Sequence, residues 1–156
     1  MDIKVHRGLE QIGGCITEIS TATSRVFIDF GQNLPGNGEA TTPEQDRLMV
    51  ENIFATNAKT YEAVFYTHGH EDHIGGIPYA MQNFRTTIHG TRLTLGLVKR
   101  KLEEFDLDKK VKMVTHEAGE VVKAGNFQVE FIHVNHSIAD AVAFAIHTPA
   151  GTVIMT

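Results

Sequence analysis

The sequence predicts a mixed α and β domain of the α+β class, with helices covering a sheet-rich core. Alternation of apolar and polar residues, which is typical of strands, occurs before residue 31 and again after residue 110. Apolar residues at helical spacing are found between these two regions. No internal repeat or long linker interrupts the 156 residues, so we expect one domain over residues 1–156.

Each element is predicted from its local pattern and from the turn residues at its ends. The first helix should begin at Pro43, with Thr42 as its cap. Two more helices are expected at residues 74–83 and 91–105. The expected strands, in chain order, cover residues 3–6, 15–19, 25–30, 63–66, 86–89, 111–114, 119–123, 127–134, 141–147 and 152–155.

Composition excludes several classes of protein. The formal net charge is −5, the wrong sign for a domain that binds nucleic acid over its whole surface, so any RNA contact must be local. The basic run Lys99-Arg100-Lys101 is interpreted as a solvated helix face, because acidic residues follow it closely. No signal peptide or membrane span is evident, so we expect a cytoplasmic protein without a membrane partner. Cys15, the single cysteine, should be a small buried residue.

Four potential metal ligands fall within six residues, directly after the predicted strand at residues 63–66. His68, His70, Asp72 and His73 lie at positions i, i+2, i+4 and i+5. Histidine nitrogen and carboxylate oxygen are preferred zinc ligands, and this spacing is too dense to be expected by chance. His68 and His70 can project from one side of an extended loop while Asp72 and His73 point away, which predicts two ligands for each of two metals. A structural zinc site would be rich in cysteine, so an open, catalytic site is favoured.

Further ligands must come from distant parts of the chain. His133 and His136 are the two options, and His136 is preferred because it follows the end of a predicted strand. The other histidines (His6, His89, His116 and His147) have no partner at ligand spacing. Asp29 ends an apolar strand, and it is interpreted either as a hydrogen-bond acceptor behind a ligand histidine or as a turn cap before Gly31.

The segment His68-Gly69-His70-Glu71-Asp72-His73 resembles the H-x-H-x-D-H signature of the metallo-beta-lactamase superfamily. Together with residues 90–97 and 134–141, it is similar to the ribonuclease J branch of the beta-CASP group. The resemblance implies an αββα sandwich with two zinc ions at one edge between its sheets, although manganese or iron would also suit these ligands. It places His68, His70 and His136 on one ion and Asp72 and His73 on the other, with Asp29 as the strand-end aspartate behind them.

The activity implied by this resemblance is hydrolysis of RNA phosphodiesters by metal-bound hydroxide, with Asp72 and His73 as catalytic candidates and RNA as the partner. Residues 6–14 look more like those of other hydrolases in the superfamily, so a small-molecule hydrolase acting on a lactone, thioester or lactam is an alternative. The family's bridging aspartate, its last histidine ligand and its beta-CASP insert would follow Thr156. Residues 1–156 are therefore expected to be the N-terminal portion of the domain, with an incomplete sandwich, and a third hypothesis is an inactive metal-binding fragment that forms a homo-oligomer.

Overall fold

The computed structural model describes residues 1–10, 12–33, 42–55, 60–83 and 85–156. The described strands form two sheets, and the described helices lie between strands of the first sheet along the chain. The strands are β1 (Asp2–Arg7), β2 (Ile16–Ser20), β3 (Ser24–Ile28), β4 (Thr60–Phe65), β5 (Thr87–Gly90), β6 (Met113–Thr115), β7 (Val121–Ala124), β8 (Phe127–His133), β9 (Val142–Thr148) and β10 (Gly151–Met155). The helices are α1 (Pro43–Ala55), α2 (Glu71–Ile74), α3 (Ile77–Asn83), α4 (Arg92–Glu103) and the short 3₁₀ helix η1 (Asp108–Lys110).

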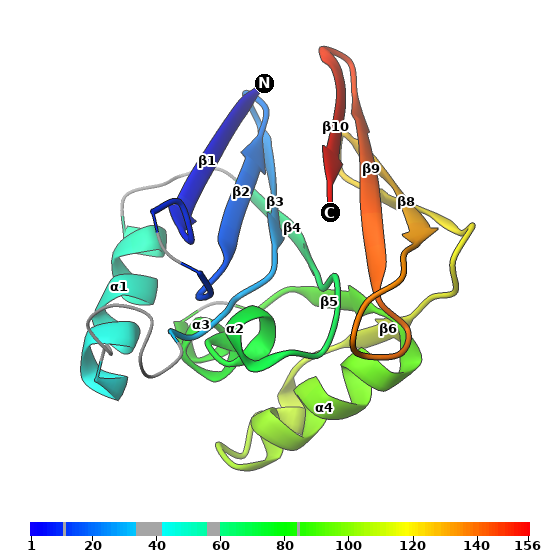
Figure 1. The fold of residues 1–156 in the computed structure, drawn as a ribbon. Helices are drawn as coiled ribbons and strands as arrows, with labels where there is room; N and C mark the ends of the chain where they lie inside the picture. The colour runs from blue at the N-terminus through cyan, green and yellow to red at the C-terminus, as the bar shows by residue number, and fades with distance from the viewer. Residues whose placement is uncertain (11, 34–41, 56–59, 84) are drawn as a thin grey trace.

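The first sheet has the order β1-β2-β3-β4-β5-β6, and it changes from antiparallel to parallel pairing at β3 (Figure 1). The pairs β3–β4, β4–β5 and β5–β6 are parallel, because a connection containing a helix separates each pair of strands in the chain. The second sheet, β10-β9-β8-β7, is antiparallel throughout. The parallel strands β4 and β5 therefore carry their carboxyl ends to the same edge of the first sheet.

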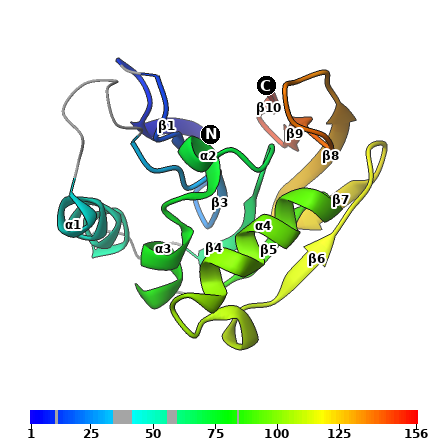
Figure 2. The same ribbon diagram turned by 60° about the horizontal axis from the view of Figure 1, so that its bottom comes forward.

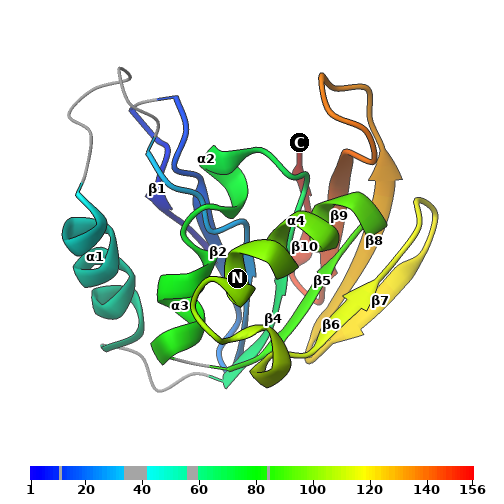
Figure 3. The ribbon, with the colours of Figure 1, turned by 90° about the horizontal axis from the view of Figure 1, so that it is seen from below.

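The two sheets pack face to face, and α1, α3 and α4 lie on the outer face of the first sheet (Figures 1 and 3). Alternation of side chains along each strand supplies one apolar cluster between the sheets and one between the first sheet and the helices. Phe65, Phe131 and Phe144 meet in the inter-sheet cluster, with ring centroids 5.0 to 6.2 Å apart. Val64 and Ile88 belong to the cluster under the helices.

The predicted α+β class and sheet-rich core are confirmed by this arrangement. Within the described ranges, the helices cover only the first sheet (Figure 2). On the second sheet, the side chains of Val121, Ile132 and Ile154 are exposed. The cap expected at Thr42 is confirmed as well. Its hydroxyl accepts a hydrogen bond from the Gln45 N–H, while the Gln45 side chain accepts one from the Thr42 N–H.

Three local predictions were wrong. The helix expected at residues 74–83 is split at Gly75-Gly76 into α2 and α3, because the Gly76 N–H leaves the helix to donate to the carbonyl of Phe30. The strand expected to reach Phe30 ends at Ile28 for the same reason, since the backbone of residues 29–31 bonds to other segments. Cys15 precedes β2 and is half-buried, so it is not a buried strand residue.

None of the described helices combines the length and the apolar character needed to cross a membrane.

Candidate metal centre

The predicted ligands lie where the loop after β4 meets the loop between β8 and β9 (Figure 1). The two loops are joined by a backbone hydrogen bond of 2.9 Å from the Val142 N–H to the carbonyl of Thr67. This bond connects the first sheet to the second, next to His68. The candidate site therefore sits at one edge of the sandwich, between the two sheets.

Three histidines from these loops form a compact cluster. His68 and His70 follow β4, and His136 comes from the loop after β8. One ring nitrogen of each lies within 4.8 Å of the others, so the three could hold a metal ion. His68 Nε2 and His70 Nδ1 are 3.1 Å apart, and the His136 ring centroid lies 4.5 Å from that of His68. Of the two options for a distant ligand, His136 joins this cluster and His133, at the end of β8, does not.

Asp72 and His73 form a second pair of donors beside this cluster. They lie on α2, not in the loop where the sequence pattern placed them. His73 Nε2 and Asp72 Oδ2 are 3.7 Å apart. The expectation that His73 points away from His68 was wrong, because the turn of α2 brings their ring centroids to 4.0 Å. The two sets of donors are therefore contiguous.

Asp29 and Thr67 connect His68 and His73 through hydrogen bonds to the Nδ1 atoms of their rings. The buried carboxylate of Asp29 accepts hydrogen bonds from the Thr67 N–H (2.9 Å), the Thr67 hydroxyl (2.8 Å) and His73 Nδ1 (2.7 Å). The Thr67 hydroxyl, having donated its proton to Asp29, accepts from His68 Nδ1 at 3.0 Å. This network assigns the protons of His68 and His73 to Nδ1 and leaves both Nε2 atoms with lone pairs for a metal. Of the two interpretations of Asp29, the hydrogen-bond acceptor matches this geometry.

The environment also sets the charge of these histidines. Burial, followed by the neighbouring His73, His136 and His70, lowers the pKa of His68 to about 3, so its ring is neutral at pH 7. Burial alone would lower the pKa of His73, but its hydrogen bond to Asp29 and the charges of Asp29 and Asp72 raise it. A neutral His68 is in the protonation state that metal binding requires.

Backbone hydrogen bonds hold α2 in place. The Asp72 carbonyl accepts from the Cys15 N–H at 2.9 Å, and the His73 carbonyl accepts from the Phe30 N–H at 2.9 Å. Gly31 passes directly beneath α2, where a Cβ atom would overlap the Asp72 carbonyl oxygen and lie 2.7 Å from the Cys15 nitrogen. A glycine is therefore required at position 31 for α2 to approach this closely.

A pocket of about 320 Å³ opens over the cluster. His68, His73 and His136 line it, together with Asn135 and Thr156. Its size would accommodate the reacting part of a substrate rather than a whole polymer. The metal candidates thus border a space that a substrate group could enter.

Sequence reasoning missed two contributors to the candidate site. Thr67 and Gly31 gave no signal of their own, and their roles depend on partners far along the chain. His89 and His116 have no partner at ligand spacing in the sequence, but the fold brings His89 Nδ1 and His116 Nε2 to 2.9 Å from each other at the ends of β5 and β6. His116 Nδ1 also bonds to Glu120, at 2.7 Å. Parallel pairing of β5 with β6 brings these residues together, which their spacing in the sequence does not indicate.

We expect the metal-free protein to lose stability as the pH falls below about 6.5. The folded-state pKa values of His68 and His89 are about 3 and about 4, against 6.5 for an unperturbed histidine. The unfolded chain therefore binds more protons below pH 6.5, and folding becomes less favourable until the folded-state values are reached. Thermal unfolding at pH 7.5 and pH 5.5 should show this loss. His73, whose pKa is raised, acts in the opposite direction. The His89→Gln variant isolates one group and should show a smaller drop in Tm, whereas an equal drop would contradict the assignment.

Comparison with protein families gives one match over most of the chain. A family model described as the beta-lactamase superfamily domain matches residues 40–155. Ribonuclease J of Helicobacter pylori is 37% identical over 153 residues, covering 96% of this chain and 22% of that protein. Ribonuclease J of a Synechocystis species is 44% identical over 99 residues, covering 62% of this chain and 16% of that protein. The chain thus spans about a fifth of the length of these relatives.

Solved structures share the fold at lower sequence identity. Zn²⁺-bound PqqB from Methylobacterium extorquens matches with a TM-score of 0.66 at 14% identity, covering 90% of this chain and 51% of that chain. The metallo-beta-lactamase fold protein YhfI from Bacillus subtilis matches with a TM-score of 0.66 at 16% identity, covering 97% of this chain and 59% of that chain. Both likenesses concern the fold.

Proposed function

Because the chain belongs to the beta-lactamase superfamily, we propose that it is the metal-binding part of a metal-dependent hydrolase that acts on RNA phosphodiesters. The observation that carries this proposal is the cluster of His68, His70 and His136, with ring nitrogens within 4.8 Å, at the mouth of a pocket. The Asp72–His73 pair beside it would hold a second ion. These five residues are the ligands predicted from the sequence.

The donor set fits zinc. Imidazole nitrogen and carboxylate oxygen are zinc ligands, and a histidine ligand commonly gives its other ring proton to a carboxylate or another acceptor. His73 does so to Asp29, and His68 does so to Thr67. When bound, such ions lower the pKa of water towards neutrality and polarise a phosphoryl or carbonyl oxygen. Manganese and iron remain alternatives for the same donors.

In this proposal, residues around the site orient the ligand histidines and hold the ligand loops together. Asp29 keeps the proton of His73 on Nδ1, so that Nε2 faces Asp72. Thr67 does the same for His68, whose Nε2 faces His70. The backbone bond between Val142 and Thr67 keeps the loop carrying His136 next to these groups. Asp72 and His73, proposed as catalytic residues, would act from α2 at the edge of the pocket.

RNA is the proposed substrate because relatives of 37% and 44% identity bear the name ribonuclease J. The formal net charge of −5 requires that RNA be contacted through a local surface. Cleavage of a 5′-monophosphorylated RNA oligonucleotide by the zinc- or manganese-loaded protein tests the proposal. A thioester and a lactone, offered at the same concentration, test the small-molecule alternative.

If RNA is the substrate, cleavage of the RNA should exceed turnover of the thioester and the lactone, and any such cleavage should be lost in the His68→Ala, His70→Ala double variant. Turnover of an ester without RNA cleavage would overturn the RNA assignment in favour of a small-molecule hydrolase. RNA cleavage that persists in the double variant would show that these histidines do not carry the activity.

A homo-oligomer and a cytoplasmic location stay predictions. The side chains of Val121 and Ile154, both 58% exposed on the second sheet, are compatible with self-association. Sedimentation at high protein concentration tests it, and a monomer under those conditions would count against association.

A further inference from the structure

Helix α4 is attached to each part of the candidate metal centre. Its first turn is bonded by Asp140, which lies in the loop after His136. The Asp140 carbonyl accepts from the Thr91 hydroxyl at 2.9 Å, and its carboxylate accepts from the Leu93 N–H at 3.3 Å. Asp140 has a φ of 61°, an unusual value for a residue other than glycine, and this places both acceptors against α4. A carboxylate at this position also complements the helix dipole.

The middle and the end of α4 contact the other two parts of the centre. A Cβ atom on Gly69, between His68 and His70, would lie 2.5 Å from Leu97 Cδ1, so Leu97 packs directly on the ligand loop. Lys101 forms an ion pair of 2.5 Å with Glu71, the first residue of α2. One exposed side of α4 is therefore fixed beside all the proposed ligands.

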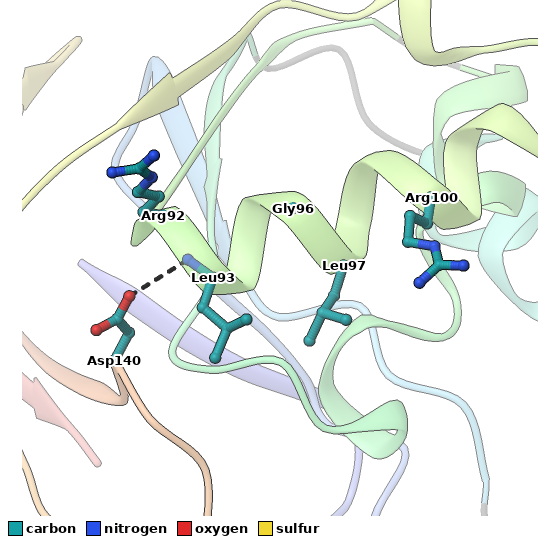
Figure 4. A pocket seen from close by; sticks show the side chains of 6 residues that line it. All are labelled: Arg92, Leu93, Gly96, Leu97, Arg100 and Asp140. Carbon is teal, nitrogen blue, oxygen red and sulfur yellow. Dashed lines mark hydrogen bonds between the residues drawn. The ribbon is translucent and has the colours of Figure 1, made fainter.

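A pocket of about 520 Å³ lies along this side of α4 (Figure 4). Leu93 and Leu97 project to the same side of the helix, with Gly96 between them, and form an apolar floor. Nothing lies within 4 Å of the position of a Cβ atom at Gly96, so the floor is open there. Arg100 stands beyond Leu97 at one end, and Arg92 and Asp140 stand at the other.

The charges around this pocket are not balanced. In the basic run of α4, Lys99 pairs with Glu103 and Lys101 pairs with Glu71. Among the residues that the structure describes, no carboxylate forms an ion pair with Arg92 or Arg100. The one acidic residue of the pocket, Asp140, already accepts a hydrogen bond from the backbone of α4. The exposed guanidinium group of Arg100 therefore stands beside an apolar floor, in a protein whose net charge is negative, while the Arg92 side chain at the other end projects to the opposite side of α4 (Figure 4).

We propose that this pocket binds one nucleotide of the RNA strand, next to the phosphodiester at the metal centre. The proposal rests on the proposed function and names a subsite for its substrate. The base or ribose would cover the floor of Leu93, Gly96 and Leu97, while Arg100 binds a phosphate beside it. Guanidinium groups suit phosphate because their N–H donors match its oxygens, and an apolar floor accepts any base. The pocket would thus supply the local contact that an acidic domain needs for RNA.

This proposal differs from the interpretation of the basic run as a solvated helix face. A solvated face would contribute no salt-dependent affinity for RNA beyond that of any other exposed arginine. Arg85 is a matched control, because it is exposed and precedes β5, whereas α4 follows the opposite end of that strand. Replacing either arginine with glutamine changes the net charge by the same amount.

The test measures binding of a 5′-monophosphorylated single-stranded RNA to chelator-treated, metal-free protein at several salt concentrations. We expect Arg100→Gln to weaken binding about tenfold, a typical value for a lost charged hydrogen bond, and to reduce the slope of log affinity against log salt by about 0.7. Arg85→Gln should leave both quantities unchanged. Equal effects of the two variants, or no effect of either, would overturn the proposal.

A second variant fills the pocket without changing its charge. Gly96→Leu places a side chain into open space on a helix, so the protein should fold with equal or higher stability while RNA affinity falls. Unchanged RNA affinity in a folded Gly96→Leu protein would overturn the proposal. Metal-dependent hydrolysis of bis(4-nitrophenyl) phosphate, which carries neither a nucleobase nor a second phosphate for the pocket, should be equal in all three variants.

The two proposals can fail separately. If the wild-type protein loaded with metal cleaves neither RNA nor the small diester, the proposed function fails, and the metal-free binding series still decides whether the pocket takes RNA. If cleavage occurs and Arg100→Gln matches Arg85→Gln in RNA binding, the subsite fails and the hydrolase stands.

Discussion

Replacing His136 with alanine should weaken zinc binding by more than about 100-fold, while replacing His133 should leave zinc affinity unchanged. Loss of a hydrogen-bond partner behind a ligand costs roughly 10- to 100-fold in affinity, and loss of a ligand should cost more. His136 is one of the three residues whose ring nitrogens cluster within 4.8 Å, and His133 is not a member of that cluster. Competition with a chromophoric zinc chelator at pH 7.5 measures both affinities.

His133→Ala is a matched control for His136→Ala. Both residues are exposed histidines, three positions apart, at the end of β8 and in the loop after it, so neither change should alter the fold. Equal zinc affinity of the two variants would remove His136 from the site. A larger loss in His133→Ala than in His136→Ala would exchange their roles.

The Gly31→Ala variant should lose about 3 kcal/mol of unfolding free energy and most of its metal affinity. A methyl group at this position overlaps the carbonyl oxygen of Asp72, and a backbone atom cannot rotate away as a side chain can. Relief of the clash must move α2, which carries Asp72 and His73, or the segment at Cys15. Urea unfolding monitored by circular dichroism measures the first effect, and zinc titration measures the second.

Gly96→Ala provides the control for this substitution. It is the same chemical change at a position where the new methyl group meets no atom within 4 Å. Its stability should be unchanged or higher by up to about 1 kcal/mol, because alanine favours a helix more than glycine does. If Gly31→Ala were as stable as Gly96→Ala and bound zinc normally, the close approach of α2 to Gly31 would be wrong.

Much of the fold and the donor set could be predicted because the information is local. Alternation and turn residues located the described strands, with end points that differ by at most three residues. The dense spacing of His68, His70, Asp72 and His73 identified them as a group. The position of His136 after the end of a strand favoured it over His133, and the structure brings His136 to His68 and His70.

The parts that sequence reasoning missed depend on contacts between distant segments. Thr67 connects His68 to Asp29, although no pattern around Thr67 indicates a role in orienting a ligand. The helical turn of α2 places His73 beside His68, whereas an extended chain would have separated them. Gly31 begins a run of glycine, asparagine and proline, and nothing in that composition indicates its close approach to the Asp72 carbonyl. Arg100 was interpreted as part of a solvated charge run. Its neighbours Lys99 and Lys101 form ion pairs with Glu103 and Glu71, and the pairing of Lys101 with Glu71 cannot be read from the sequence.

The central claim is that His68, His70 and His136 hold a metal ion beside the Asp72–His73 pair. Anomalous diffraction at the zinc absorption edge, from crystals of the zinc-loaded protein, tests it most directly. We expect a peak about 2.0 to 2.1 Å from one ring nitrogen of each of His68, His70 and His136, with a second peak near Asp72 and His73. Zinc bound away from these residues, or no peak at the cluster in the presence of excess zinc, would contradict it.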